Sequence, residues 1–133
     1  MNQHLLIVDD EPEVLSLLEE IFHEEYTIHR AESGKQALEI LKTTPIQVLI
    51  ADQRMPGMTG LELLANMAKT VSHADSIVKV LLSSYADVAE IVKAIPSVGL
   101  HQYVLKPINP DRLRKAVKAA KNRSSKSGDW VLT

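Results

Sequence analysis

The segment Leu5–Phe22, LLIVDDEPEVLSLLEEIF, contains one strand and one helix with an acidic turn between them. Leu5–Val8 is continuously apolar, which is typical of a strand covered on both faces in a parallel sheet. Pro12 suits the first turn of a helix, where its missing N–H costs nothing. The apolar residues that follow have the spacing of one buried helix face; they are Val14, Leu17, Leu18, Ile21 and Phe22.

The same alternation continues to the end of the chain. Four more short apolar runs predict strands at Tyr26–Ile28, Val48–Ala51, Ile77–Leu82 and Tyr103–Leu105. Between them, Ser33 and Thr59 are candidate N-caps of a second and a third helix. A fourth helix is expected from about residue 87 to 95, ended by Pro96 and Gly99, and a fifth opens at Pro110. This βαβαβαβαβα order predicts an α/β fold with a parallel sheet.

The 133 residues fit one domain, which we expect at 3–122, with 123–133 as a polar tail or the start of a linker. The chain has no cysteine, which excludes thiolate metal sites and disulfides within it. A net charge of −2 argues against direct nucleic-acid binding and against an anionic membrane surface. No signal peptide and no membrane span is predicted, so we expect a cytoplasmic location.

Chemically active side chains follow four of the five predicted strands. Ligands of open α/β sheets bind beyond the carboxyl ends of the strands, near the point where the strand order reverses. If the strand order is 2-1-3-4-5, three carboxylates, a hydroxyl and an ammonium meet there. These groups belong to Asp9, Asp10, Asp52, Ser83 and Lys106.

Such a cluster of carboxylates needs compensation. Two unit charges about 4 Å apart repel by roughly 4 kcal/mol at an effective dielectric constant of 20. A hard divalent cation such as Mg²⁺, together with Lys106, can supply the positive charge. The same groups would hold a phosphoryl group, and the remaining carboxylate could act as its nucleophile.

At these residues the sequence resembles the receiver domains of two-component response regulators. Four segments carry the resemblance, which covers about residues 3–122: Leu5–Glu11 (LLIVDDE), Val48–Gly60 (VLIADQRMPGMTG), Ser83–Ser84 and Tyr103–Pro107 (YVLKP). The resemblance implies a flavodoxin-like (βα)5 doubly wound parallel sheet of strand order 2-1-3-4-5. It also implies a phosphoprotein of a phosphorelay that does not turn over a substrate of its own.

The resemblance assigns a role to each site residue. Asp52 is the phosphoacceptor, and Lys106 pairs with the phosphoryl group. Asp10 and Asp52 would bind Mg²⁺ (or Mn²⁺ as a substitute) directly, Asp9 through a water, and Arg54 through its backbone carbonyl. Ser83 and Tyr103 form the switch. The bond between Lys106 and Pro107 is expected to be cis.

The implied partners are a sensor histidine kinase or a histidine phosphotransfer protein. A further output domain, or a homodimer, would use the face of the fourth helix, the fifth strand and the fifth helix. The residues themselves leave two other interpretations open. One is a Mg²⁺-dependent phosphatase with an aspartyl nucleophile, although Glu11 or Pro12 stands where its acid–base Asp is expected. The other is a flavin-binding protein, which the acidic turn after Val8 disfavours.

The long cationic side chain of Arg54 could screen Asp52 or contact a phosphatase, or it could simply be exposed.

The histidines do not predict a metal site, because no two of them have i, i+4 spacing on a helix; they are His4, His23, His29, His73 and His101. His101 could share a strand face with Tyr103, near the switch.

Overall fold

The computed structural model describes residues 2–124, and in this range five strands alternate with five α-helices. The strands are β1 (Gln3–Val8), β2 (Tyr26–Ala31), β3 (Val48–Asp52), β4 (Val78–Ser83) and β5 (Gln102–Leu105). The α-helices are α1 (Pro12–Phe22), α2 (Gly34–Thr43), α3 (Gly60–Thr70), α4 (Val88–Val98) and α5 (Pro110–Ser124). Two short 3-10 turns, η1 (Ala74–Ser76) and η2 (Tyr85–Asp87), flank β4. The predicted order of elements is confirmed.

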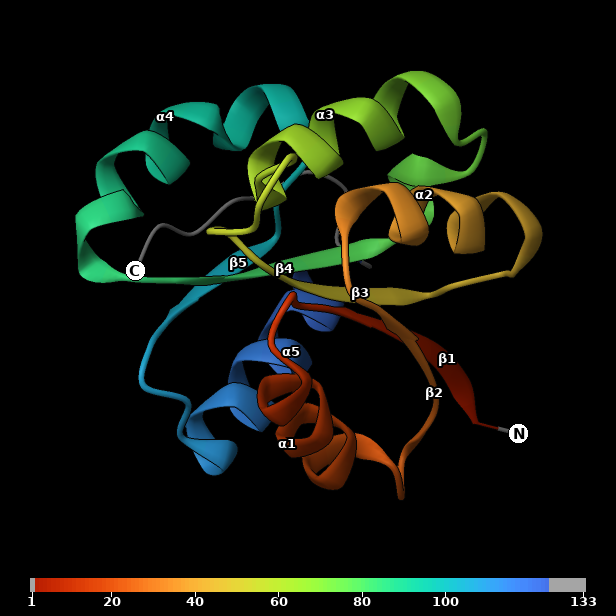
Figure 1. Ribbon diagram of the computed structural model, residues 1–133, viewed down its shortest axis with the longest axis vertical. Helices are drawn as coiled ribbons and strands as arrows, with labels where there is room; N and C mark the ends of the chain where they lie inside the picture. Colours follow the sequence, from red (N-terminus) through yellow and green to blue (C-terminus); the bar gives the residue numbers. More distant parts are fainter. Residues whose placement is uncertain (1, 125–133) are drawn as a thin grey trace.

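All neighbouring strands pair in parallel, in the order β2-β1-β3-β4-β5. Helices α2, α3 and α4 cover one face of the sheet, and α1 and α5 cover the other (Figure 1). The strand order reverses between β1 and β3, as expected for a doubly wound sheet. The carboxyl ends of β1, β3, β4 and β5 therefore meet at one edge, which we call the carboxyl edge of the sheet.

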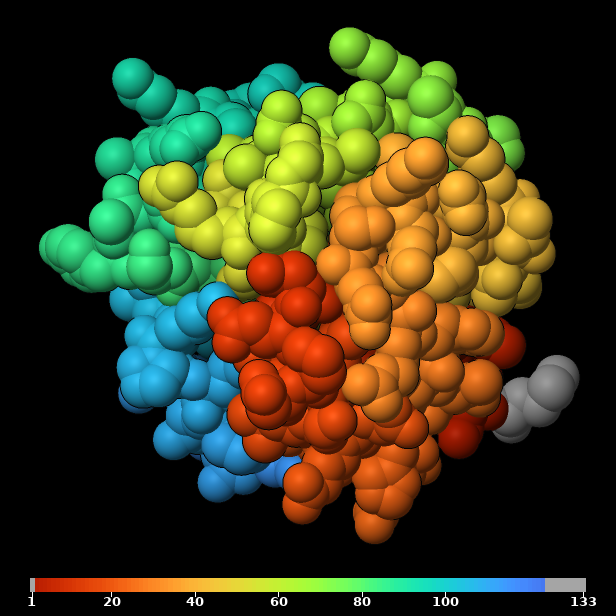
Figure 2. All heavy atoms as spheres, viewed as in Figure 1, coloured from red at the N-terminus to blue at the C-terminus, as the bar shows by residue number. Residues whose placement is uncertain are grey.

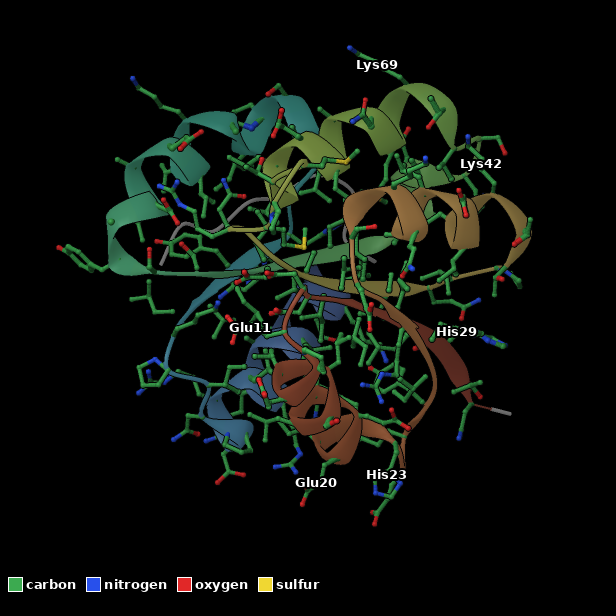
Figure 3. The ribbon with its side chains drawn as sticks, viewed as in Figure 1. Glu11, Glu20, His23, His29, Lys42 and Lys69 are labelled. Carbon is green, nitrogen blue, oxygen red and sulfur yellow. The ribbon has the colours of Figure 1, made fainter. Side chains whose placement is uncertain are left out.

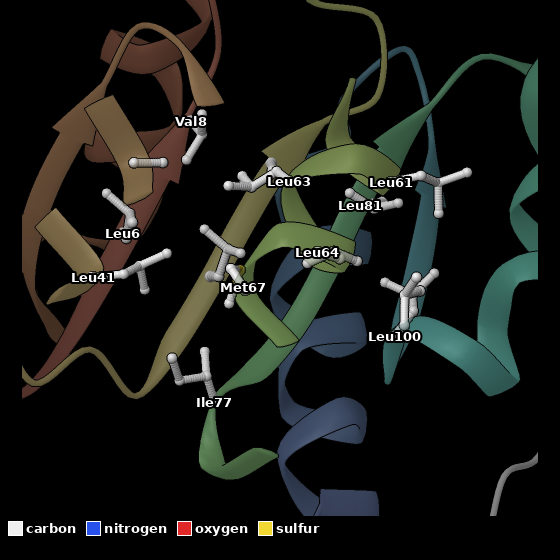
Figure 4. Packing of buried hydrophobic residues seen from close by; sticks show 14 of the residues in the cluster. Leu6, Val8, Leu41, Leu61, Leu63, Leu64, Met67, Ile77, Leu81 and Leu100 are labelled. Atoms are coloured by element: carbon white, nitrogen blue, oxygen red, sulfur yellow. The ribbon is translucent and has the colours of Figure 1, made fainter. Parts of the chain in front are cut away.

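Each face of the sheet has its own apolar core. Alternate residues of the strands enter opposite cores: Leu6 and Val8 pack beneath α2 and α3, whereas Leu5 and Ile7 pack against α1 and α5. Figure 4 shows the first core, in which Leu63 and Met67 of α3 lie over the sheet. Because β1 and β3 are buried on both faces, their sequences are continuously apolar at Leu5–Val8 and Val48–Ala51.

The helix starts agree with the sequence. The Ser33 side chain accepts a hydrogen bond from the backbone N–H of Gln36 at 3.1 Å, as an N-cap does. Thr59 and Glu62 form a reciprocal capping box at the start of α3. Helix α4 ends at Gly99, whose φ of 69° lies in the left-handed region that favours glycine.

Three details differ from the sequence-based expectation. The buried face of α1 contains Leu15 instead of Leu17, whose exposed fraction is 37%. Helix α1 has leucines on both sides of the predicted stripe, so the pattern alone left the face uncertain by one position. Pro96 does not end α4, which runs on to Val98, because a proline near the last turn removes only one helical hydrogen bond. Helix α5 reaches Ser124, and residues 125–133 of the expected tail lie outside the described residues.

Within residues 2–124, no helix combines the length and the apolar character that crossing a bilayer requires.

Candidate functional site

Three carboxylates meet where β1 and β3 end. Asp9 and Asp10 follow β1, Asp52 is the last residue of β3, and one oxygen from each lies within 4.8 Å of the others. Asp9 and Asp52 are buried, with exposed fractions of 0% and 3%, whereas Asp10 is exposed. The segments that follow β1, β3 and β5 also adjoin one another in the space-filling view, in red, yellow and blue (Figure 2). The predicted meeting of these residues is confirmed.

One oxygen of this cluster has no protein partner. Asp9 Oδ1 accepts a hydrogen bond from the backbone N–H of Glu11 at 2.9 Å. Asp9 Oδ2 is buried and has no hydrogen-bond partner among the described residues. An unpaired buried oxygen of a carboxylate is costly unless a cation or water approaches it. The donor set consists of carboxylate oxygens, which suit Mg²⁺ or Mn²⁺ better than softer metals.

Lys106 supplies positive charge to the cluster. It follows β5, and its Nζ lies 2.5 Å from Asp52 Oδ1. Its backbone N–H donates to the Ser83 carbonyl at 2.9 Å, which holds Lys106 beside the end of β4. The bond between Lys106 and Pro107 is cis, as expected. The Lys106 side chain remains 34% exposed, so the ammonium can meet an arriving anion.

The cluster perturbs the pKa values of its own members. Burial raises the pKa of Asp9 to about 6, and the neighbouring charge of Asp52 adds to the rise. Burial also raises the pKa of Asp52, although the hydrogen bond and charge of Lys106 oppose it. Burial lowers the pKa of Lys106, but the carboxylates of Asp52, Asp9 and Glu11 outweigh this effect and the net shift is upward. The site therefore holds more negative charge than its protein partners compensate.

Ser83 and Tyr103 lie on the same face of the sheet. In the β4–β5 register Leu81 pairs with Tyr103, and Ser83 is two residues beyond Leu81, so both side chains point toward the core under α2–α4. Ser83 is 1% exposed, and its hydroxyl donates to the Ser84 carbonyl at 2.7 Å. Tyr103 is half-buried and packs against the same core.

Asp87 is a site residue that the sequence reasoning missed. Its carboxylate is 1% exposed and forms an ion pair with Arg54, whose Nη2 lies 2.6 Å from Asp87 Oδ1. Asp87 was expected only as the start of the fourth helix, but its side chain makes no capping hydrogen bond there. The interpretation of Arg54 as a merely exposed side chain holds only in part: 72% of the side chain is exposed, but its guanidinium is paired with Asp87. No contact described here involves the Arg54 carbonyl, so its role as a metal ligand stays a prediction.

Gln53, also missed, closes the loop of residues 54–59 at its base. Gln53 is 2% exposed; its carbonyl accepts from Gly60 N–H at 3.0 Å, and its side chain accepts from Leu61 N–H at 2.9 Å. A Cβ on Gly60 would lie 2.7 Å from the carbonyl oxygen of Asp52, so only glycine fits there. The start of α3 thus packs directly against the end of β3 and holds Asp52 in place.

The histidines lie away from the carboxylate cluster. His4 Nδ1 and His29 Nε2 are 2.8 Å apart at the β2 side of the sheet, where His29 projects outward (Figure 3). His101 directly precedes β5, and its Nδ1 accepts a hydrogen bond from the Lys79 N–H at 3.0 Å. A shared face with Tyr103 stays a prediction. Burial, with the charges of Lys79 and Arg123, lowers the pKa of His101 to about 4. None of these histidines contributes to the three-carboxylate group.

Comparisons with known proteins agree with this geometry. The sequence profile of the response regulator receiver domain matches residues 5–118. The hydrogenase transcriptional regulatory protein HoxA of Cupriavidus necator is 34% identical over 125 residues, which cover 94% of this chain and 25% of that protein. Sporulation initiation phosphotransferase F of Bacillus subtilis is 32% identical over 119 residues, which cover 89% of this chain and 93% of that protein.

The fold is similarly matched. The crystal structure of a response regulator receiver domain protein (CheY-like) from Methanospirillum hungatei aligns with a TM-score of 0.82 and 26% identity, covering 96% of this chain and 100% of that one. This chain thus spans a quarter of the length of one curated relative and nearly all of another.

Proposed function

Because this chain belongs to the response regulator receiver domain family, we propose that Asp52 is its phosphoacceptor and that Lys106, Ser83 and a divalent cation assist the transfer. The observation that carries this proposal is the juxtaposition of Asp52 with an ammonium at 2.5 Å and with two further carboxylates. A lone buried aspartate would be neutralised by one cation, but this cluster retains excess negative charge. It is therefore suited to binding a cation first and an anionic phosphoryl group second.

Asp9, Asp10 and Asp52 would hold Mg²⁺ or Mn²⁺, with the Arg54 carbonyl as a further ligand. Bound there, the cation would neutralise carboxylate charge and bind phosphoryl oxygens, as Mg²⁺ does in phosphoryl transfer. The unpaired Asp9 Oδ2 supports a ligand or a metal-bound water at that oxygen. Of the three carboxylates Asp10 is the exposed one, which supports its assignment as a direct ligand.

In the transfer step a carboxylate oxygen of Asp52 attacks the phosphorus of a donor phosphohistidine. The new bond joins this oxygen to phosphorus, and the phosphorus–nitrogen bond breaks. The imidazole leaves neutral with the bonding electron pair, because its other nitrogen carries a proton. Lys106 loses its partner charge on Asp52 in this step and pairs with a phosphoryl oxygen instead, which stabilises the charge that develops there.

Receiver domains are phosphoacceptors, and we propose that the chemistry of this chain is limited to phosphoryl transfer onto Asp52 and to hydrolysis of the product. A water molecule attacks the phosphorus, inorganic phosphate leaves and the Asp52 carboxylate is restored. The phosphoryl donor would be a sensor histidine kinase or a histidine phosphotransfer protein. The cytoplasmic location expected from the sequence stays a prediction.

The phosphorylated state would be transmitted by Ser83 and Tyr103 to the face formed by α4, β5 and α5. Both side chains point into the same core from adjacent strands, so movement of Ser83 toward a phosphoryl oxygen changes the space available to Tyr103. An output domain or a second copy of the chain would bind that face. The length of the hydrogenase regulator relative supports a further domain, while the sporulation phosphotransferase relative supports a free-standing chain.

Phosphorylation with acetyl phosphate tests the proposal. In the presence of Mg²⁺, intact-mass measurement is expected to show one phosphoryl adduct, which EDTA prevents and Asp52→Asn removes. Asp111→Asn, which changes an exposed aspartate at the start of α5, is the matched control and should be labelled like the wild type. Undiminished labelling of Asp52→Asn would contradict the assignment.

A further inference from the structure

A chain of hydrogen bonds connects the Ser83 hydroxyl to the Arg54 guanidinium. Ser83 Oγ donates to the Ser84 carbonyl at 2.7 Å, and Ser84 Oγ donates to Asp87 Oδ2 at 3.1 Å. Arg54 Nη2 then donates to Asp87 Oδ1 at 2.6 Å. The Asp87 N–H also donates to the Ser84 carbonyl at 3.1 Å, so the loop of residues 84–87 is held at both ends.

The ion pair between Arg54 and Asp87 differs from an ordinary ion pair on the surface. Arg54 Nε lies 3.1 Å from both oxygens of Asp87, so the guanidinium meets the carboxylate through two nitrogens. The carboxylate is 1% exposed, and a buried charge depends on its partner far more than an exposed one does. The pair joins the loop after β3, directly beyond Asp52, to the start of α4; these segments lie next to each other in yellow and green (Figure 2).

The Ser83 hydroxyl cannot donate to the Ser84 carbonyl and to a phosphoryl oxygen on Asp52 at the same time. A serine hydroxyl has one proton to donate, and here it goes to the Ser84 carbonyl. To donate to a phosphoryl oxygen on Asp52, Ser83 must release that carbonyl. The same carbonyl is anchored to Asp87, and Asp87 is anchored to Arg54. Each contact that fixes the loop therefore favours the arrangement without a phosphoryl group.

We infer that the Arg54–Asp87 ion pair is a latch, which holds the loop of residues 84–87 in the unphosphorylated arrangement and opens when Asp52 is phosphorylated. Asp87 is then a positioning residue that acts through Ser84 and Ser83 without touching the phosphoryl group. This inference rests on the proposed function of Asp52. It predicts that weakening the latch makes the phosphorylated arrangement easier to reach.

Beryllofluoride, a stable phosphoryl mimic, measures this directly in the 133-residue chain with saturating Mg²⁺. Asp87→Asn keeps the shape of the side chain but removes its charge, and we expect it to bind beryllofluoride about 5-fold more tightly, a typical size for coupling between two states. In the unliganded variant, the amide NMR shifts of residues 83–90 should move toward their positions in the beryllofluoride-bound wild type. A merely structural role of Asp87 would not move the shifts in that direction.

Arg54→Gln removes the other half of the pair from an exposed position and should reproduce both effects. The double variant should gain no more than either single change, because the two residues act as one unit. Glu90→Gln, which removes a charge near Arg54 from an exposed position on α4, is the matched control and should leave the affinity unchanged. Unchanged or weaker beryllofluoride binding by both single variants would overturn the latch. If the wild type itself does not bind beryllofluoride, the proposed function fails instead.

Discussion

Two lysines at opposite edges of the sheet show how differently the same side chain is used. Lys79, the second residue of β4, is 3% exposed, and its Nζ donates to the carbonyls of Ala74 at 2.6 Å and Ile77 at 3.0 Å. Lys106, beyond the end of β5, is partly exposed and pairs with a carboxylate that has two more carboxylates beside it.

The surroundings of the two lysines shift their pKa values in opposite directions. Burial lowers the pKa of Lys79, whose hydrogen-bond partners are neutral carbonyls. The carboxylates around Lys106 raise its pKa in spite of partial burial. At the amino edge of the sheet, the ammonium of Lys79 has hydrogen-bond partners and its role is structural. The carboxyl edge keeps uncompensated negative charge, which lowers stability but allows the site to bind a cation and react.

The largest effect is expected from exchanging the two lysines for methionine one at a time. Lys79→Met removes the charged donor that the buried carbonyls of Ala74 and Ile77 share and should lower the free energy of unfolding by about 2–4 kcal/mol, while phosphorylation continues. Lys106→Met should slow phosphorylation by acetyl phosphate by about 100-fold or more, as the loss of one charge-stabilising donor does elsewhere. Its effect on unfolding should be the smaller one, because a third of the side chain is exposed.

Urea unfolding and intact-mass kinetics on both variants, with Mg²⁺ present, measure the contrast. If Lys106→Met lost more stability than Lys79→Met and still accepted a phosphoryl group at the normal rate, the distinction between the two edges would be wrong.

A medium effect is expected from Asp9→Asn. The pKa of Asp9 is about 6 in the folded protein, against an ordinary value of 3.8 that applies to the unfolded chain. Protonation of this carboxyl therefore favours folding at pH below about 4, and this contribution is lost as the pH rises through 6. At pH 7.5 without metal, Asp9→Asn should therefore raise the free energy of unfolding by up to about 3 kcal/mol, since the pKa of Asp9 is raised by about two units and one unit corresponds to about 1.4 kcal/mol.

The same substitution should weaken Mg²⁺ binding, measured by calorimetry, by about 10- to 100-fold, as changes beyond the direct ligands do. Asp10→Ala should weaken it more than Asp9→Ala, because Asp10 is proposed as the direct ligand. A metal-free Asp9→Asn protein less stable than the wild type would show that burial of this carboxylate is already compensated. Equal effects of Asp9→Ala and Asp10→Ala on Mg²⁺ would mean that their roles are not distinct.

The smallest effects concern how far the phosphoryl signal travels. NMR shifts on beryllofluoride binding should be large along the α4–β5–α5 face, at residues 83–98 and 102–118, and small at Lys79 and His101. Ser83→Ala should still be phosphorylated but lose most of this response, and adding Tyr103→Ala should cause little further loss. A full response in Ser83→Ala, or equal shifts at both edges of the sheet, would contradict a switch confined to the carboxyl edge.

The carboxyl edge could be predicted from sequence because the carboxyl ends of parallel strands lie at one edge of the sheet. Each residue that directly follows a buried apolar run must therefore lie at that edge. This reasoning located Asp9, Asp10, Asp52, Ser83 and Lys106 without knowledge of any contact. The loops between those residues could not be predicted in the same way, since their side chains follow no period.

Asp87 illustrates that limit. Its position marked only the expected start of a helix, whereas its ion pair is with Arg54, which is 33 residues earlier in the chain. The hydrogen bonds of Lys79 to two nearby carbonyls could not be predicted either, because the sequence does not indicate which acceptors a lysine in an apolar strand will contact. Leu15 replaced Leu17 on the buried face of α1 for a simpler reason: a leucine-rich helix offers two overlapping stripes.

The closure of residues 54–59 by Gln53 and Gly60 has a practical consequence for protein engineering. Since the two ends of this loop are fastened to each other and to the strand behind them, its exposed tip at Pro56 and Gly57 is the part that can be exchanged. Arg54, Met55 and Thr59 must stay, because they pair with Asp87, enter the core and cap α3. The tip turns at Gly57, whose φ is 81°, and a second glycine could lengthen it there. Designers could thus change what approaches Asp52 from this side by rewriting only the tip, while the carboxylate keeps its anchorage.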